Sequence, residues 1–158
     1  MSNSPAGAAN APPASERKVD TLLTHYGLSH THPTNELIHY FAIPAIMLSL
    51  TGLLFALHPG LVLALLAASM MYYARLSWRF TGCMLLAASV LLALVDAMQT
   101  RGVLVPVSVV MFVVAWIFQF IGHRIEGKKP SFFEDLQYLL VGPLFVLSKV
   151  FLRWSLRW

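Results

Sequence analysis

Three histidines stand close together near the start of the sequence, in the stretch SHTHPTNELIHYFAIP, and another stands far downstream in FQFIGHRIE. They are His30, His32, His39 and His123. Imidazole is the commonest metal ligand in proteins, and two or three histidines with a carboxylate and open coordination positions are typical of non-haem iron oxygenases. These residue types therefore allow a metal site. The alternative is that the histidines bind backbone ends or lipid head groups at a membrane surface.

Helical spacing groups these histidines with other polar side chains. Asn35 and His39 are four residues apart. Further along, Gln119, His123 and Glu126 follow one another at intervals of four and three residues. Side chains at such intervals share one face of a helix. Polar groups inside a membrane bundle are costly unless they are paired, so we expect Asn35, Gln119 and Glu126 to act beside a metal, orienting its ligands or the substrate.

The composition indicates that the elements holding these residues lie in lipid. Of the 158 residues, 58% are hydrophobic and 11% are charged, and the mean hydropathy is +0.69. Soluble chains usually carry about a quarter charged residues. The net charge of +4 is spread over few residues, which suits an anionic membrane surface and predicts no nucleic-acid partner. The single cysteine, Cys83, excludes an internal disulfide and a thiolate metal cluster.

We expect an all-α, polytopic membrane bundle. A membrane-spanning helix needs roughly 20 mostly apolar residues. The first helix is predicted to follow Pro33, with Thr34 or Asn35 as its N-cap. The sequence HPG at 58–60 is predicted to join the first two spans as an antiparallel hairpin. Four segments are predicted to be transmembrane helices, at residues 37–57, 61–74, 80–98 and 103–121.

The two ends of the chain receive different predictions. Residues 1–20 are rich in Ala, Pro, Ser and Asn and contain no apolar signal-peptide core, so they are predicted to form a disordered tail. Residues 21–158 are predicted to form a single membrane-embedded domain. Near the C-terminus an apolar stretch is interrupted by Gly142 and Pro143, which predicts a re-entrant or interfacial helical hairpin. A fifth span is the alternative.

The basic residues predict the orientation of the bundle, because cytoplasmic loops carry an excess of Lys and Arg. With the N-terminus inside, only Arg101 falls outside, whereas His39 and His123 both fall at the cytoplasmic face. The basic residues that then lie inside are Arg17, Lys18, Arg75, Arg79, Arg124, Lys128 and Lys129. Histidines about 90 positions apart are therefore expected to meet at one face of the membrane.

With these residues assembled, the sequence resembles the membrane-bound, iron(II)-dependent 2-hydroxy fatty acid dioxygenases, formerly a domain of unknown function. One motif is HxxPxNxxIH, from His30 to His39, followed by Pro44. The second is WIFQFIGH with a following Glu and KKP, at residues 116–130, and a weaker similarity is EDLQYLLVGPLFV at 134–146. The resemblance covers about residues 26–151.

The resemblance implies an α-oxidation in which Fe(II) and O2 convert a long-chain 2-hydroxy fatty acid to the acid one carbon shorter. The fungal member acts in the breakdown of the sphingolipid base phytosphingosine. The resemblance implies that His30, His39 and His123 are the iron ligands, with His32 as an additional candidate. The fungal pattern has Asn at the position of His32 and one more residue before the Glu of the second motif. The roles of His32 and Glu126 therefore stay open.

The expected setting follows from an amphipathic substrate. Its acyl chain would stay among the spans and the membrane lipids, while its carboxylate reaches the cytoplasmic face. Lys128 and Lys129 are candidates for binding the carboxylate there. We expect an integral protein of a bacterial inner membrane or the endoplasmic reticulum, acting as a single chain or a homo-oligomer. The main alternative is a non-enzymatic scaffold or lipid-binding protein with interfacial histidines. A desaturase or hydroxylase is disfavoured because the sequence has no HxxHH box.

Overall fold

The computed structural model describes residues 17–28, 30–127 and 138–156, and within these ranges the regular structure is entirely helical. The helices are α1 (Lys18–Gly27), α2 (Pro33–Leu57), α3 (Pro59–Ala74), α4 (Trp78–Thr100), α5 (Leu104–Ile125) and α7 (Val141–Arg153). The predicted all-α class is therefore confirmed. Helix α1 includes the last residues of the segment 1–20 for which composition predicts a disordered tail, and residues 1–16 lie outside the described part.

Within the described residues, three helices are long and apolar enough to cross a membrane. They are α2 with 25 residues, α4 with 23 and α5 with 22. Helix α3 has 16 residues, which at 1.5 Å per residue gives roughly 24 Å, less than the ~30 Å hydrocarbon core. Three of the four predicted spans thus have the required length, and a membrane-spanning role for α3 stays a prediction.

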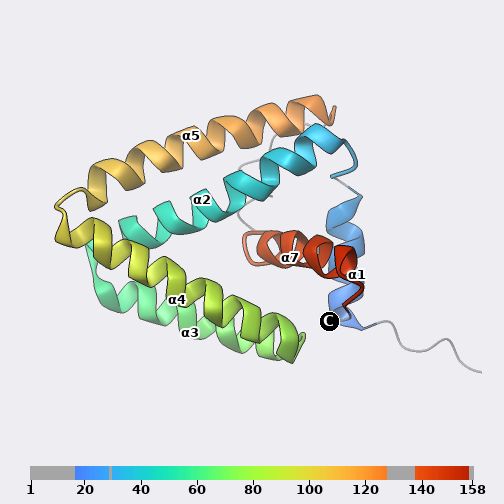
Figure 1. The fold of residues 1–158 in the computed structure, drawn as a ribbon, viewed down its shortest axis with the longest axis horizontal. Helices are drawn as coiled ribbons and strands as arrows, with labels where there is room; N and C mark the ends of the chain where they lie inside the picture. The colour runs from blue at the N-terminus through green and yellow to red at the C-terminus, as the bar shows by residue number, and fades with distance from the viewer. Residues whose placement is uncertain (1–16, 29, 128–137, 157–158) are drawn as a thin grey trace, which may run out of the picture.

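The long helices form two antiparallel pairs that diverge like the arms of a V (Figure 1). Helix α2 packs against α5, and α3 packs against α4. The pairs approach each other at one end of the molecule, and α1 and α7 lie at the other end, where the arms spread apart (Figure 1). Because α2 and α5 run in opposite directions, the start of α2 and the end of α5 lie at the same end of the bundle.

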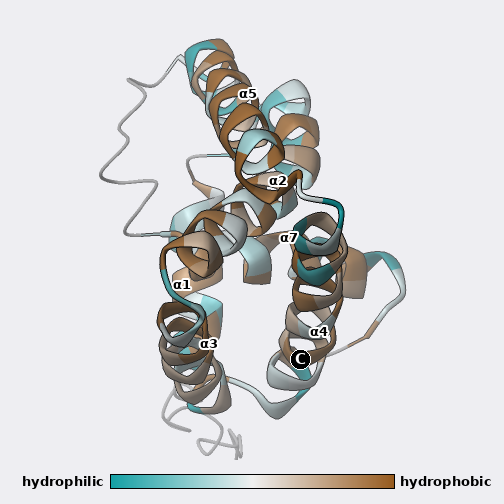
Figure 2. Cartoon of the chain, turned by 90° about the vertical axis from the view of Figure 1, so that its left-hand side faces the viewer, coloured by the Kyte–Doolittle hydropathy of each residue, from teal (hydrophilic) through white to brown (hydrophobic). Residues whose placement is uncertain are grey.

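The outer surfaces of the long helices are apolar. On α5, Val110 is 62% exposed and Ile117 is 51% exposed, and on α4 Leu86 is 68% exposed. Figure 2 shows hydrophobic residues along the visible sides of both helices, with hydrophilic residues toward helix ends. A helix that is apolar on its exposed side suits a lipid solvent, which fits the composition.

Small residues let α2 and α5 approach closely at two levels. A side chain at Gly52 would collide with Ser108, and a side chain at Gly122 would collide with Asn35. Glycine and serine at helix contacts are typical of membrane bundles, where close backbone packing replaces the hydrophobic effect as the source of stability. The contact at Gly122 brings the end of α5 against the first turn of α2.

Helix α7 is attached to both arms of the V. The rings of Phe151 and Phe80 stack with centroids 5.4 Å apart, joining α7 to α4. Lys149 forms an ion pair with Glu36 of α2, with Nζ and Oε1 3.2 Å apart. These contacts hold the apolar face of α7 against the start of α2, beside the clustered histidines.

The structure revises the predicted interruption at Gly142 and Pro143. Both residues lie in the first turn of α7, which begins at Val141. Proline is tolerated in a first helical turn because the backbone N–H it lacks has no intrahelical acceptor there. The interruption thus marks the start of a helix. The other arm of the predicted hairpin falls largely on residues 128–137, outside the described part.

Candidate metal centre

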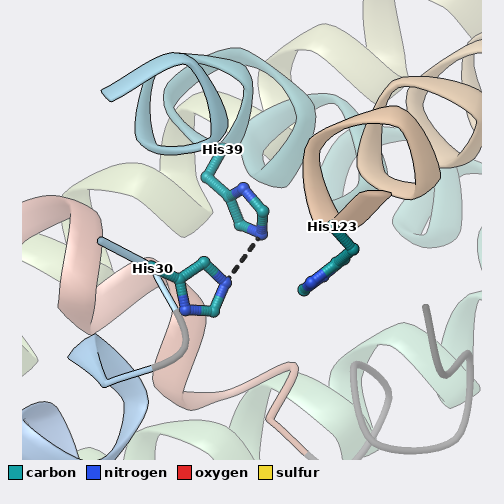
Figure 3. A group of neighbouring side chains, drawn as sticks. All are labelled: His30, His39 and His123. Carbon is teal, nitrogen blue, oxygen red and sulfur yellow. Dashed lines mark hydrogen bonds between the residues drawn. The ribbon is translucent and has the colours of Figure 1, made fainter. Parts of the chain in front are cut away.

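Three histidines from three segments meet in the interior of the protein (Figure 3). His30 comes from the loop between α1 and α2, His39 from the second turn of α2, and His123 from the last turn of α5. One ring nitrogen from each lies within 4.8 Å of the others. Their exposed fractions are 4%, 1% and 6%. We call these residues the histidine cluster.

Backbone carbonyls fix the orientation of two rings. The Nδ1 atom of His30 lies 2.8 Å from the carbonyl oxygen of Tyr26. The Nδ1 atom of His39 lies 2.8 Å from the carbonyl oxygen of Asn35. A carbonyl oxygen only accepts hydrogen bonds, so each Nδ1 carries the hydrogen and donates it. Metal-bound histidines are commonly held in this way, with the other nitrogen left to the metal.

The remaining nitrogens of these two rings face each other. The Nε2 atoms of His30 and His39 are 3.0 Å apart. When Nδ1 carries the hydrogen in a neutral imidazole, Nε2 bears a lone pair. Two lone pairs at this distance repel each other unless a proton or a metal cation lies between them. The buried arrangement therefore fits a cation, and the His123 ring offers a third nitrogen close by.

Aromatic rings enclose His30. Tyr26 stacks on it with centroids 4.2 Å apart and an interplanar angle of 11°. Phe145 of α7 lies against the same ring, with centroids 5.6 Å apart. Tyr26 lies in the last turn of α1 and His30 in the loop that follows, so helical spacing does not reveal their contact in the sequence. The stacking restricts the ring to one orientation in an apolar setting.

Glu126 holds the loop that carries His30, and it lies outside the group of donor atoms described above. Its carboxylate accepts hydrogen bonds from the backbone N–H and hydroxyl of Thr31, from the backbone N–H of His32 and from the Asn35 amide. Burial alone would raise the pKa of this group, but these hydrogen bonds outweigh it and lower the pKa from 4.5 to about 2. Glu126 is therefore an ionised positioning residue.

Asn35 connects the Glu126 carboxylate to the histidine cluster. Its side chain is fully buried, its Nδ2 donates to Glu126 Oε2 at 3.0 Å, and its backbone carbonyl holds His39. Its Oδ1 lies against Gly122 and has no hydrogen-bond partner among the described residues. The predicted contribution of Asn35 to the site is thus made through both its backbone and its side chain.

Gln119 lies one helical turn before His123 on α5. It is buried, with 4% exposed, and its Oε1 has no hydrogen-bond partner among the described residues. Gln119 lines a small cavity of about 20 Å³ together with Tyr26 and Trp116. A buried amide oxygen that lacks a donor costs free energy, which makes Gln119 a candidate for hydrogen bonding to a ligand.

The structure does not bring His32 into the histidine cluster. His32 is exposed and is the N-cap of α2, in place of the predicted Thr34 or Asn35. Its Nδ1 accepts a hydrogen bond from the backbone N–H of Thr34 at 3.2 Å. Lys128 and Lys129, which are predicted to bind the carboxylate of the substrate, lie outside the described residues. The sequence does not reveal that Thr31 belongs to the site, because its contact with Glu126 joins positions that are 95 residues apart.

One comparison with known proteins identifies the family of the chain. The family described as 2-hydroxy-palmitic acid dioxygenase Mpo1-like matches residues 17–153, a range that holds all three histidines of the cluster and extends from α1 to the end of α7. No curated protein and no solved structure matches the chain. The resemblance noted in the sequence is therefore confirmed: the chain belongs to the 2-hydroxy-palmitic acid dioxygenase Mpo1-like family.

Proposed function

We infer that the protein is an iron(II)- and O2-dependent dioxygenase that shortens long-chain 2-hydroxy fatty acids by one carbon. In this reaction the C1–C2 bond breaks, C1 leaves as CO2, and C2 becomes the new carboxyl carbon. The acid loses four electrons, which reduce one O2, and one oxygen atom leaves as water. Membership of the family supports the reaction class, and the histidine cluster supports a metal.

The observation that carries the proposal is the pair of facing Nε2 atoms of His30 and His39, 3.0 Å apart. Their Nδ1 hydrogens are held by backbone carbonyls, so both lone pairs are directed at one buried point. Three imidazoles suit iron and zinc alike and leave coordination positions open. We assign iron because the family is a dioxygenase family, and Fe(II) would supply the electrons that activate O2.

The other residues have roles that follow from their contacts. Glu126 and Asn35 would fix the His30 loop relative to α2, so that the histidines keep their positions when substrate enters. Gln119 offers its amide to the 2-hydroxyl or carboxyl group of the substrate. Tyr26 and Phe145 exclude water from one side of the cluster through their contacts with the His30 ring.

The membrane setting supports an amphipathic substrate. Helices α2 and α5 carry the cluster at the end of an otherwise apolar pair. A fatty acid could therefore keep its acyl chain in apolar surroundings while its head group reaches the histidines. We propose that the cluster lies toward the cytoplasmic face, where Lys128 and Lys129 would attract the carboxylate, and that a reducing compartment keeps the iron ferrous.

The proposal is tested with purified protein in detergent, loaded anaerobically with Fe(II) and given O2. We expect 2-hydroxyhexadecanoic acid to yield pentadecanoic acid, CO2 and water with equal consumption of O2. Hexadecanoic acid and 3-hydroxyhexadecanoic acid serve as matched controls and should consume no O2, because neither places a hydroxyl beside the carboxyl group. Equal O2 consumption with all three acids contradicts the proposal, because the 2-hydroxyl group would then be irrelevant to the reaction. No consumption with any acid also contradicts it and favours the lipid-binding alternative.

A further inference from the structure

The face of α2 that carries His39 continues away from the histidine cluster as an apolar stripe. Ile43, Ile46 and Leu50 follow His39 at intervals of four, three and four residues, so they share its helix face. Ile46 is buried against Trp116 of α5, and Trp116 itself lies on the same helix face as His123. The apolar stripe therefore begins one helical turn from His39.

Two cavities lie along this stripe. The first is the cavity of about 20 Å³ beside Gln119, which is also lined by Ile43 and Leu139. The second, of about 60 Å³, is lined by residues of α2, α3 and α4, including Leu50 and Ala88, and again by Leu139. Leu139 thus lines both cavities. We call the route from Gln119 past Leu139 into the second cavity the inner path.

We propose that the inner path binds the acyl chain of the substrate, with the methyl end in the second cavity between α2, α3 and α4. This inference rests on the proposed function and extends it to the residues that select chain length. The head group would lie at the histidine cluster, within reach of the Gln119 amide oxygen that has no donor among the described residues.

The chemistry of the second cavity suits a hydrocarbon chain. Its three hydroxyl groups, on Thr51, Ser69 and Tyr73, donate hydrogen bonds of 2.7, 2.7 and 3.0 Å to backbone carbonyls. They therefore offer the cavity no unpaired donor. The cavity is also lined by Met47, Met70 and Met84, whose flexible side chains can move to admit a guest. A polar end and an apolar end thus occur in the order that a fatty acid requires.

The length of the inner path predicts a long chain. From His39 to Thr51 the helix advances twelve residues, or roughly 18 Å at 1.5 Å per residue. An extended hydrocarbon chain advances roughly 1.25 Å per carbon, from bonds of about 1.5 Å and angles near 111°. The inner path therefore has the length of roughly fourteen carbons by this arithmetic, and its two cavities, of about 20 and 60 Å³, must widen to admit such a chain.

An outer groove between α2 and α5 is the competing location. It has a volume of about 440 Å³ and is lined by apolar residues alone, among them Phe41, Ala45 and Phe118. Phe41 is 73% exposed, and both Phe41 and Ala45 lie on the side of α2 away from His39. The outer groove lacks a polar end and faces the surroundings of the protein, so we assign it to membrane lipid.

The first test locates the chain end without requiring turnover. The full protein in detergent is irradiated with 2-hydroxyhexadecanoic acid carrying a diazirine at its methyl end, and labelled residues are identified by mass spectrometry. We expect labels on α3 and α4, at positions such as Leu66 and Leu91. Labels on Val114 or Phe118 of the outer groove, or in neither region, overturn the proposal. If labelling follows the expectation but no acid is oxidised, the inner path stands and the proposed reaction fails.

A second test uses matched substitutions. Ala88→Phe fills the second cavity, and Ala45→Phe fills the outer groove. We expect Ala88→Phe to shift the ratio of turnover of 2-hydroxydodecanoic over 2-hydroxyhexadecanoic acid by at least about tenfold toward the shorter acid, since single methylenes in apolar pockets change selectivity by such factors. Ala45→Phe should leave the ratio unchanged. A shift with Ala45→Phe and none with Ala88→Phe overturns the proposal.

Discussion

The loop that leads into α2 and the loop that leads into α3 use the same local chemistry. In each, a histidine followed by proline is the N-cap, and its Nδ1 accepts a backbone hydrogen bond, at 3.2 Å for His32 and 3.0 Å for His58. Only the first loop also carries a buried histidine, His30. The difference lies in what surrounds each loop: α1, α7 and the end of α5 enclose the first, while the second joins two helices directly.

This contrast separates two uses of histidine in one chain. A capping histidine has one ring nitrogen engaged with its own helix and remains exposed. In His30 and His39 the Nδ1 atom is held by a carbonyl while Nε2 is directed at a shared point. Burial therefore distinguishes the three candidate metal ligands from the capping histidines, and in His30 and His39 the carbonyl partner of Nδ1 does so as well.

The largest effect is expected from replacing a buried histidine. His39→Ala should lower the rate of product formation from 2-hydroxyhexadecanoic acid by more than about a hundredfold, since it removes a ligand and not merely its support. His58→Ala, the matched change at a capping histidine, should leave the rate within about twofold. Comparable losses in the two variants would remove the distinction between the two kinds of histidine.

Glu126→Gln should weaken metal binding without removing a ligand. The change keeps the shape of the side chain but removes the charge that holds Thr31, His32 and Asn35. Mutation of residues that support metal ligands typically lowers metal affinity about 10- to 100-fold. Glu36→Gln, which alters an ion pair with Lys149, is the control and should have little effect. The readout is the Fe(II) dissociation constant from anaerobic titration, and an unchanged constant for Glu126→Gln would contradict the positioning role.

The same carboxylate predicts a pH dependence of stability. The pKa of Glu126 is about 2 in the folded protein against an ordinary 4.5, so its contribution is complete above pH 4.5 and is lost as the pH falls toward 2. The Tm of metal-free protein in detergent should therefore fall over this window in the wild type and fall less in Glu126→Gln. An equal fall in Tm in both proteins would show that ionised Glu126 does not stabilise the fold in this pH range.

A smaller effect is expected from closing the gap between α5 and α2. Gly122→Ala adds a methyl group that collides with Asn35, and over-packing of this kind costs about 1–3 kcal/mol. Gly82→Ala is the matched control, because nothing lies within 4 Å of its added methyl group. It should be neutral or stabilising. Thermal unfolding in detergent distinguishes them, and equal Tm values would contradict the close contact.

The smallest effect is expected from the caps themselves. His32→Ala should lower stability by about 1 kcal/mol or less, in the range of other N-cap losses, and should leave the iron content unchanged. The comparison with His58→Ala, measured by thermal unfolding and metal analysis together, is the check. Loss of iron in His32→Ala would restore His32 as a ligand.

The sequence predicts much of the site because the topology is simple. Antiparallel spans bring His39 and His123 to one end, and the intervals of three and four residues place Asn35 and Gln119 beside them. The sequence does not reveal that Glu126 binds the Thr31 loop, because a contact between positions 95 apart depends on how the two helix ends pack. Spacing alone does not separate His30 from His32, which are two residues apart. The resemblance favours His30, and the structure distinguishes the two by burial and by the partner of Nδ1.

The fold shows the same division. Long apolar segments predict α2, α4 and α5, whose stability in lipid depends on length and composition. The position of α7 depends on individual contacts, such as the stacking of Phe151 on Phe80, and hydrophobic periodicity carries no information about such a partner. Gly142 and Pro143 correctly indicate a break in regular structure, but packing determines that a helix starts there.

The most direct test of the central claim is the iron content of detergent-purified protein after anaerobic Fe(II) reconstitution, measured on the wild type and on His39→Ala, His123→Ala and His58→Ala. The histidine cluster predicts about one iron per chain in the wild type and in His58→Ala, and a loss of iron in the other two variants. A wild type that binds no iron, or His39→Ala and His123→Ala variants that retain it, would contradict the assignment of the cluster as a metal centre.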